Sequence, residues 1–256
     1  MAMIQHCSIY KTLILFIAGS LLGMANATAD KMEFEIGKTL YKNALSSPED
    51  IKGWVIESSV EGQPAITFPN GRMRMESEVH FLLWCPLDFP DNIRITWEFQ
   101  PRRDDGLAMF WLAAKGREGE DLFDDSLAER TGAYPQYFDG DINALHVAYF
   151  RRNFHGEPLE ERSFQTSHLR KSHGFHLVAD AADPIPSVRD VVGPYQMEII
   201  KYGAYFRFSI NGLKILEWKD DGSKGPILEG GKIGLRQMAG LIADYGKLKV
   251  EEIRSK

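Results

Sequence analysis

The amino-acid sequence predicts an all-β fold in which two antiparallel sheets pack face to face. Short apolar runs alternate with turn residues at fairly regular intervals, and almost no segment keeps a helical period for long. Residues 94–100 (RITWEFQ) alternate between apolar and polar side chains, as expected of a strand with one buried face. Asn211-Gly212, between two apolar runs, is a strong signal for a two-residue hairpin turn.

The chain begins with a segment that we expect to be a cleaved export signal, residues 1–29. Lys11 supplies positive charge, residues 12–24 form an apolar run, and small residues at 25–29 provide cleavage sites. The apolar run is shorter than the roughly 18 residues of a membrane-spanning helix, so we expect no membrane anchor after cleavage. Residues 30–256 are then expected to form a single domain that is periplasmic or secreted.

Eight segments of the mature chain have the pattern of strands. They are residues 94–100, 107–114, 144–150, 195–201, 205–210, 215–218, 232–238 and 246–253. Residues 107–114 (LAMFWLAA) are apolar on both faces, as expected of a central strand. Residues 115–140 and 153–192 lack a strand pattern, and loops of this length in a compact domain usually frame a functional site.

The predicted strand at residues 144–150 lies between these two segments, and its two faces carry different kinds of side chain. We expect Leu145, Val147 and Tyr149 to pack against the opposite sheet. On the other face, His146 lies between two alanines, whose small side chains leave room for a ligand above an open sheet surface. A buried histidine that packs among small neighbours is the alternative, and the sequence leaves both interpretations open.

Residue types that suit a sugar ligand are concentrated near this strand. Aromatic rings can stack on sugars, and Arg, His and Gln side chains can bond hydroxyl or carboxylate groups. The candidate catalytic residues are His146, Tyr137 and Arg151. The candidate substrate-binding residues are Tyr134, Asn143, Arg152, His168, Arg170, Lys171, His173, His176, Arg236 and Gln237.

The charge of the chain argues against a nucleic-acid partner. The net charge of −6 becomes −7 after cleavage, because the removed segment contains Lys11 and no acidic residue. Nucleic acid requires a dense basic surface, which an acidic chain lacks. Positive charge is clustered locally at Arg151-Arg152 and Arg170-Lys171. These pairs could face an acidic sugar, or they could be solvated surface charge.

The motif of a retaining glycosidase is absent from the sequence. Such enzymes need two carboxylates about 5–5.5 Å apart, and no strand carries the Glu-x-Asp-x-x-Glu arrangement. Asp139 and Asp141 could contribute to a loose structural calcium site, although the rest of a calcium-binding loop is missing. Zinc lacks support, because Cys85 is the only cysteine of the mature chain and His173 and His176 have no evident third ligand. We therefore expect no required cofactor.

Elimination from a uronic acid is a chemistry that needs no carboxylate pair. It requires a base at the α-proton, an acid for the leaving oxygen and a cation that stabilises the enolate-like intermediate. His146 or His176 could act as the base. Tyr137 or Tyr149 could act as the acid, with Arg151, Arg170 or Asn143 as the stabilising group.

Three stretches of the chain, at residues 113–153, 169–186 and 230–250, resemble one bacterial family. One of these stretches is LRKSHGFHLVADAADPIP. The family is the YesU-like family, and the resemblance extends over roughly residues 40–253. The resemblance implies a concanavalin A-like jelly roll and a genomic setting of acidic polysaccharide breakdown. The resemblance brings no established mechanism, so it assigns no catalytic residue. This sequence also departs from the family in having an export signal, which we do not expect of every member.

We therefore expect an extracytoplasmic protein that acts on pectin-type or other uronic-acid saccharides by elimination or hydrolysis. Whether it is an enzyme stays open. If it is one, it would be a polysaccharide lyase or a glycoside hydrolase without the usual carboxylate pair. A non-catalytic sugar-binding module of a polysaccharide-utilisation system is the main alternative, and a scaffold for a partner protein is another.

Overall fold

The computed structural model describes residues 33–59, 62–152 and 165–256. Residues Phe34–Lys256 form one compact unit. The expected export signal lies outside the described residues. Within the described ranges, no helix is both long and apolar enough to cross a bilayer.

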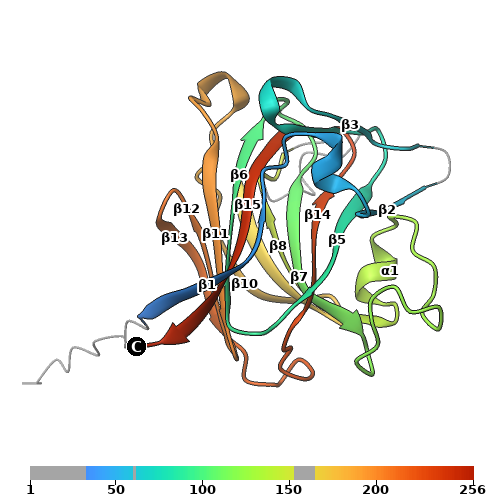
Figure 1. Ribbon diagram of the computed structural model, residues 1–256, viewed down its shortest axis with the longest axis vertical. Coiled ribbons are helices and arrows are strands. Elements are labelled where there is room, and N and C mark those ends of the chain that lie inside the picture. The colour runs from blue at the N-terminus through green and yellow to red at the C-terminus, as the bar shows by residue number, and fades with distance from the viewer. Residues whose placement is uncertain (1–32, 60–61, 153–164) are drawn as a thin grey trace, which may run out of the picture. The chain divides into compact units, whose positions relative to one another are not determined.

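Two antiparallel sheets make up this unit (Figure 1). Sheet A has the spatial order β13 (Leu213–Lys219), β12 (Tyr205–Ile210), β11 (Tyr195–Tyr202), β6 (Ile93–Pro101), β15 (Ile242–Ser255), β4 (Met73–Glu76) and β3 (Ala65–Thr67), and β1 (Phe34–Asn43) also pairs with β15. Sheet B has the order β10 (His176–Ala182), β9 (Thr166–Ser172), β8 (Ile142–Tyr149), β7 (Ala108–Gly116), β14 (Gly231–Gln237), β5 (Phe81–Phe89) and β2 (Val55–Ser58). The prediction of two antiparallel sheets is confirmed.

Helical structure in the described residues is limited to short turns. These are α1 (Pro135–Phe138) and the 3-10 turns η1 (Pro48–Ile51), η2 (Pro69–Gly71) and η4 (Val188–Asp190). In Figure 1, α1 lies on the side of sheet B that faces away from sheet A.

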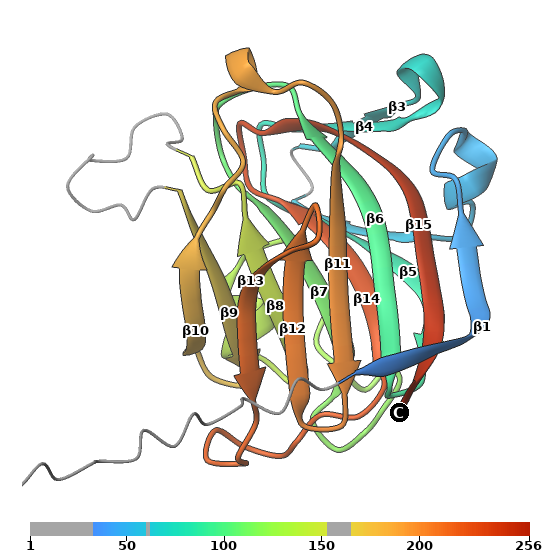
Figure 2. The ribbon, with the colours of Figure 1, turned by 90° about the vertical axis from the view of Figure 1, so that its left-hand side faces the viewer.

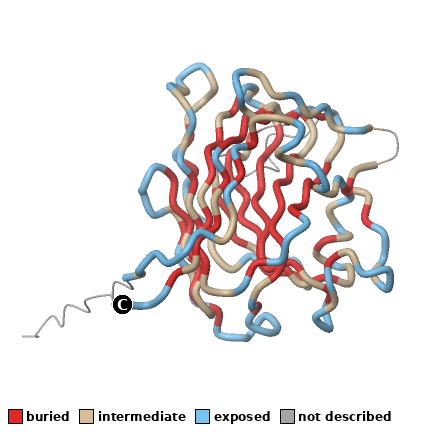
Figure 3. Tube along the Cα trace, viewed as in Figure 1, coloured by how far each residue is buried: buried red, intermediate tan, exposed pale blue. Residues whose placement is uncertain are grey.

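The main core lies between the two sheets, and strand alternation explains its composition. Trp97 of β6 stacks on Phe110 of β7, with 4.3 Å between ring centroids. The Trp97 indole Nε1 also donates a hydrogen bond of 3.2 Å to the Tyr149 hydroxyl. Leu145 and Val147 belong to the same core, so the predicted inward face of β8 is confirmed. The buried strands in Figure 3 follow this pattern, with exposed residues concentrated at the ends of the sheets.

Sheet B is unusual because its outer face is also largely buried. A second apolar cluster includes Trp84, Trp111, Leu122 and Tyr137. Leu122 and Tyr137 belong to residues 117–140, which include α1 and cover this face (Figure 1). The apolar residues on both faces of β7 are therefore explained, because one face packs in the main core and the other in this second cluster.

The expectation that residues 153–192 lack strands is wrong in part. Residues 166–182 contain a hairpin, in which β9 and β10 form the edge of sheet B (Figure 2). Charged and polar side chains on the outer face of β9 hide the apolar alternation on which the sequence-based assignment depends. The hairpin places the side chains of His168 and Arg170 beside β8.

Candidate functional site

The outer face of sheet B brings together residues that are far apart in the sequence. Across the strands, Arg236 lies opposite Met109, Met109 opposite Ala148, and Ala148 opposite His168. In the adjacent row, Trp111 lies opposite His146, and His146 lies opposite Arg170. Register therefore places the predicted candidates His146, His168, Arg170 and Arg236 on one face.

His146 occupies the centre of this face but is covered. Its exposed fraction is 1%, and its ring stacks on Trp111 with 4.1 Å between centroids. The expectation of an open imidazole is therefore wrong. The physical reason is that Tyr134, from the segment between β7 and β8, lies over the ring and its hydroxyl is 2.8 Å from His146 Nε2.

The environment of His146 keeps the imidazole neutral. Burial is the largest cause that lowers the pKa of His146 well below its ordinary value, and the charges of Arg170 and Arg236 act in the same direction. Its Nδ1 atom is buried and has no hydrogen-bond partner within the described residues. His146 can therefore exchange a proton with Tyr134, whereas Tyr134 shields it from direct contact with a bound molecule.

Tyr134 is half-buried and forms the centre of an aromatic group on the surface. Its ring packs edge-on against Phe138 and Phe175, with centroid distances of 5.2 and 5.6 Å. Burial raises the pKa of Tyr134 to about 12. Phe175 is 46% exposed, so this group offers an aromatic surface to a ligand.

Three arginines surround Tyr134. The guanidinium of Arg170 lies over the Phe175 ring at 3.7 Å and donates to the Phe175 carbonyl. Arg151 Nη1 is 3.2 Å from His168 Nδ1, and Arg151 Nε is buried without a hydrogen-bond partner in the described part of the chain. Arg236 is completely buried, lies close to the Tyr134 and Tyr137 rings and donates to the Gly132 carbonyl.

These arginines share an electrostatic property. Within residues 33–59, 62–152 and 165–256, none of the three forms an ion pair with a carboxylate. On sheet A, by contrast, Arg74 pairs with Asp244 and Arg94 pairs with Glu198. Burial lowers the pKa of both Arg170 and Arg236. In the described residues, these three arginines therefore carry positive charge that no carboxylate ion pair neutralises.

His168 adds positive charge to this surface only when its imidazole is protonated. Burial, followed by the charges of Arg151 and Arg170, lowers the pKa of His168. Asp180 of β10 lies opposite His168 in the strand register and opposes this shift. An anion bound beside His168 would favour its protonated form, because opposite charge stabilises imidazolium.

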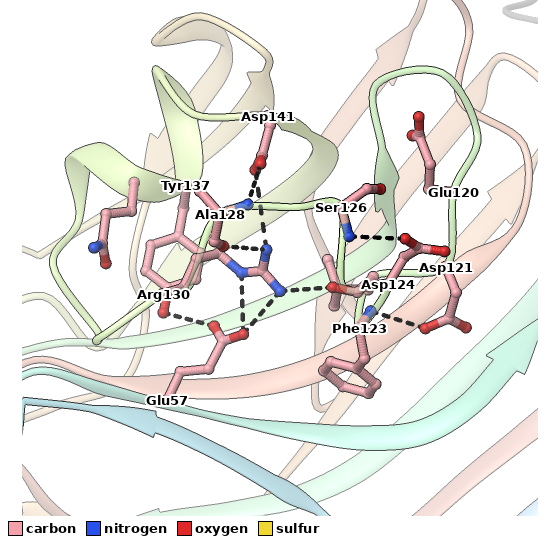
Figure 4. Close-up of polar contacts among 12 residues, drawn as sticks. Glu57, Glu120, Asp121, Phe123, Asp124, Ser126, Ala128, Arg130, Tyr137 and Asp141 are labelled. Atoms are coloured by element: carbon pink, nitrogen blue, oxygen red, sulfur yellow. Dashed lines mark hydrogen bonds and ion pairs between the residues drawn. The ribbon is translucent and has the colours of Figure 1, made fainter.

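Tyr137, a predicted catalytic residue, lies beneath the surface and anchors the covering segment. Its hydroxyl donates to the Glu57 carboxylate at 2.7 Å, and Trp84 Nε1 donates to the same oxygen at 2.9 Å. Arg130 donates to the other Glu57 oxygen and to the Leu122 carbonyl (Figure 4). Glu57 thus fixes the segment that carries Tyr134, and Tyr137 takes part in this support.

Three other predicted residues point away from the outer face. Arg152 contacts buried Asp183 at 3.3 Å. Lys171 pairs with Asp220 at 2.6 Å, and Gln237 donates to the Leu241 carbonyl at 2.8 Å. All three side chains are buried, so they serve the fold rather than a ligand on this surface.

Asn143, His173 and His176 line a separate pocket at one end of sheet B. Its volume is about 320 Å³, and its other lining residues include Arg117, Ser172 and Lys224. The remaining predicted substrate-binding residues therefore divide between two places. One is the outer face around Tyr134, and the other is this end pocket.

The described residues offer little for a metal ion. No group of three or more His, Cys, Asp or Glu side chains suited to a metal is found in the described part of the chain. Asp139 is exposed. Asp141 accepts a 2.6 Å hydrogen bond from the Ala128 backbone amide, which gives it a role in holding the covering segment (Figure 4).

Trp111 and Phe175 are site residues that the sequence analysis did not identify. Trp111 supports the His146 ring, and Phe175 supports the Arg170 guanidinium. Trp111 is hidden in an apolar run, so only the strand register reveals its position beside His146. The pattern HGFH at 173–176 places an aromatic residue between two histidines, which is the available signal for Phe175.

Comparisons with known proteins place this geometry in context. A family model described as a domain of unknown function, DUF1961, matches residues 38–250. The uncharacterized protein YesU of Bacillus subtilis is 50% identical over 223 residues, which are 86% of this chain and 98% of that protein. The predicted resemblance to the YesU-like family is confirmed.

Solved structures show the same fold. A Bacillus subtilis protein of unknown function with a galectin-like fold has a TM-score of 0.82 and 49% identity, and the match covers 88% of this chain and all of that one. A variant of LamA from Z. galactanivorans, solved with laminaritriose and laminaritetraose, has a TM-score of 0.54 and 8% identity, with coverage of 85% and 100%. The predicted jelly-roll sandwich is confirmed.

Proposed function

The chain belongs to the DUF1961 family, and from its site geometry we propose that it binds acidic poly- or oligosaccharides of the uronic-acid type outside the cytoplasm. The binding surface is the outer face of sheet B around Tyr134. We call it the arginine face and define it by Arg151, His168, Arg170, Tyr134 and Phe175.

The observation that carries this proposal is the set of arginines that have no carboxylate partner among the residues that the structure describes. Leaving a buried or half-buried guanidinium unpaired is unfavourable, because the charge loses solvation without gaining a counter-ion. Arg151 and Arg170 can each offer paired N–H donors to a carboxylate, which matches the planar group of a uronic acid. A bound carboxylate would supply the charge that the described residues around these arginines do not.

The aromatic residues support a sugar rather than a simple anion. Phe175 and Tyr134 present ring surface beside the guanidinium of Arg170. Aromatic rings pack against the apolar faces of pyranose rings while the neighbouring polar groups bind hydroxyls and carboxylates. The shared fold with a laminari-oligosaccharide complex is consistent with this use of the sandwich.

Elimination is a second candidate function, favoured by the hydrogen bond between Tyr134 and His146. Tyr134 would take the proton on the carbon next to the carboxylate and pass its own proton to neutral His146. The C–H electrons would form the carbon–carbon double bond as the glycosidic C–O bond breaks. Tyr134 would then give the abstracted proton to the leaving oxygen and regain its own proton from His146. The arginines would stabilise the enolate-like intermediate.

Binding is tested by calorimetry with galacturonic acid oligosaccharides and with neutral galactose oligosaccharides of the same length. We expect binding of the acidic series and a loss of about tenfold or more for Arg151→Gln and for Arg170→Gln, because each removes a charge-assisted hydrogen bond. Arg254→Gln, at an exposed position on sheet A, removes the same charge and should bind as the wild type. Equal affinity for the neutral series would contradict the proposal.

Catalysis is tested with the same acidic substrates by following the absorbance of new double bonds and the release of reducing ends. If elimination occurs, Tyr134→Phe should abolish the absorbance change while much of the binding remains. Binding without either product across pectic and algal polyuronides would select the binding module.

A further inference from the structure

We propose that the pocket at the end of sheet B is a second binding site, which takes one carboxylate-bearing sugar unit of the same acidic oligosaccharide. We call it the end pocket and define it by Arg117, Asn143, Ser172, His173, His176 and Lys224. This inference rests on the proposed function of the arginine face, and it adds a site at a different place on the molecule.

The end pocket is formed by four segments that are remote in the sequence. Residues that follow β7, the first residues of β8, the turn between β9 and β10, and the loop between β13 and β14 all contribute to its lining. In Figure 2, the turn between β9 and β10 and the loop after β13 lie near the same end of the molecule. Its volume of about 320 Å³ is at the small end of ligand pockets, which suits one sugar unit.

Hydrogen bonds hold the walls of the pocket together. Asn143 Oδ1 accepts from the His173 backbone amide at 3.2 Å, and Asn143 Nδ2 donates to the Arg117 carbonyl at 3.4 Å. Lys171 Nζ donates to Asp220 Oδ2 at 2.6 Å and to the Gly225 carbonyl at 2.9 Å. The side chains of Asn143 and Lys171 therefore join the loops to the sheet, so the pocket is a fixed part of the fold.

The chemistry of the lining selects an anion. Arg117 and Lys224 provide positive charge, and neither forms an ion pair with a carboxylate in the part of the chain that the structure describes. His173, His176 and the Ser172 hydroxyl provide further hydrogen-bonding groups. Glu118 is the acidic residue of the lining, and it is exposed.

Two buried polar atoms in this lining have no partner within the described residues. They are Ser172 Oγ and His173 Nδ1, and Ser172 is only 1% exposed. Buried polar groups in folded proteins are normally hydrogen-bonded, so this hydroxyl and ring nitrogen leave unused hydrogen-bonding capacity in residues that line the pocket. A small shift of either side chain would let it bond a carboxylate or a sugar hydroxyl.

Strand β9 connects the two sites. His168, Arg170 and Ser172 alternate along the same face of this strand. Ser172 is four positions after His168, which corresponds to about 13 Å along a strand. An oligosaccharide bound at the arginine face could therefore reach the end pocket with a further sugar unit, and affinity would rise once the chain is long enough to occupy both sites.

The test measures affinity for galacturonic acid oligosaccharides as a function of their length. The wild type should gain affinity at the length that first reaches both sites. The double variant Arg117→Gln/His176→Gln should lose this gain, by about tenfold or more for long oligomers, and keep the wild-type affinity for the shortest oligomers that bind. Arg170→Gln should weaken binding at every length.

A second readout locates the ligand directly. In the nuclear magnetic resonance spectrum of the imidazole groups, galacturonate should move the signals of His173 and His176, and galactose should not. An unchanged length dependence in the double variant, together with unmoved signals, would overturn the second site while leaving the arginine face intact. Absence of any binding by the wild type would contradict both proposals. Thermal unfolding of each variant checks that the fold is retained.

Discussion

His146 is a titratable residue that is buried in the folded chain and accessible to water in the unfolded chain. Its burial under Tyr134 favours the neutral imidazole in the folded state, so its pKa lies well below the ordinary value of 6.5. Below about pH 6.5 the unfolded chain binds a proton that the folded chain does not bind. The free energy of unfolding should therefore fall as the pH falls through this range, and it should be insensitive to this group above it.

The variant His146→Gln provides the test of this pH dependence. Well below pH 6.5, one such histidine contributes a slope of about 1.4 kcal/mol per pH unit. The variant should lose about this much slope in urea unfolding measured between pH 5 and 7. Part of the wild-type slope should remain, because burial also lowers the pKa of His80 and of His168. An unchanged slope would contradict the buried neutral imidazole.

The sequence identified many of the right residue types for the site but could not assign them all to one face. Neighbouring residues in a strand point to opposite sides, so Arg170 and Lys171 cannot share a surface, nor can Arg236 and Gln237. The structure places Arg170 and Arg236 on the outer face, whereas Lys171 and Gln237 make buried contacts elsewhere. The cover over His146 was not predictable, because Tyr134 reaches it through a segment without a strand or helix period.

At the scale of elements, the segment between β7 and β8 depends on one buried carboxylate. Glu57 of β2 accepts hydrogen bonds from Trp84, Arg130 and Tyr137. These contacts attach residues 122–137 to the edge of sheet B. The position of Tyr134, and with it the shape of the arginine face, therefore depends on a strand far away in the sequence.

Glu57→Gln should detach this segment. The substitution removes the closer carboxylate partner of buried Arg130 and leaves it the 4.0 Å contact with Asp141, and breaking a buried ion pair costs about 3–5 kcal/mol. Urea unfolding should show this loss, and hydrogen exchange should increase in residues 122–137. Glu78→Gln is the matched control. It breaks the exposed pair with Arg103, which should cost less than about 1 kcal/mol. Equal effects of the two variants would contradict the anchoring role.

Eight strands were predicted from alternation or continuous apolar runs, and each corresponds to an observed strand from β6 to β15. Three of the missed strands lack this pattern for identifiable reasons, whereas β5 (FLLWCPLDF) begins with an apolar run that was not assigned. β9 (TSHLRKS) carries charged residues on its outer face, and β3 has only three residues. β1 is mostly exposed, so it has little apolar alternation to detect. Pairing with β15 stabilises β1 and pairing with β8 stabilises β9, and such long-range contacts do not appear in a local pattern.

At the scale of the whole molecule, the arginines of sheet A and those of the arginine face differ in their ion pairing. Several arginines of sheet A are neutralised by carboxylates, as in the contacts of Arg94 with Glu198 and Glu251. Among the described residues, the arginine face has no such ion pair, so we infer that an acidic protein can still attract an acidic ligand locally. A net negative charge, which argues against a nucleic-acid partner, is therefore compatible with the proposed acidic sugar.

The proposed export is a second property of the whole molecule, and it would decide which saccharides the protein meets. We predict that a bacterial host expressing the full chain will release a mature form that starts near Thr28 or Asp30. Mass spectrometry of the periplasmic and culture fractions gives the start of the mature chain. An intact amino terminus on protein that stays in the cytoplasm would contradict the export signal and would limit the ligand to imported oligosaccharides.

The most direct test of the central claim is a crystal structure of the protein with a galacturonic acid oligosaccharide. The account predicts a carboxylate within hydrogen-bonding distance of the Arg151 and Arg170 guanidinium groups, and a sugar ring packed against Phe175. A saccharide bound on sheet A, or one that leaves all three arginines of the outer face without an anionic partner, would contradict it.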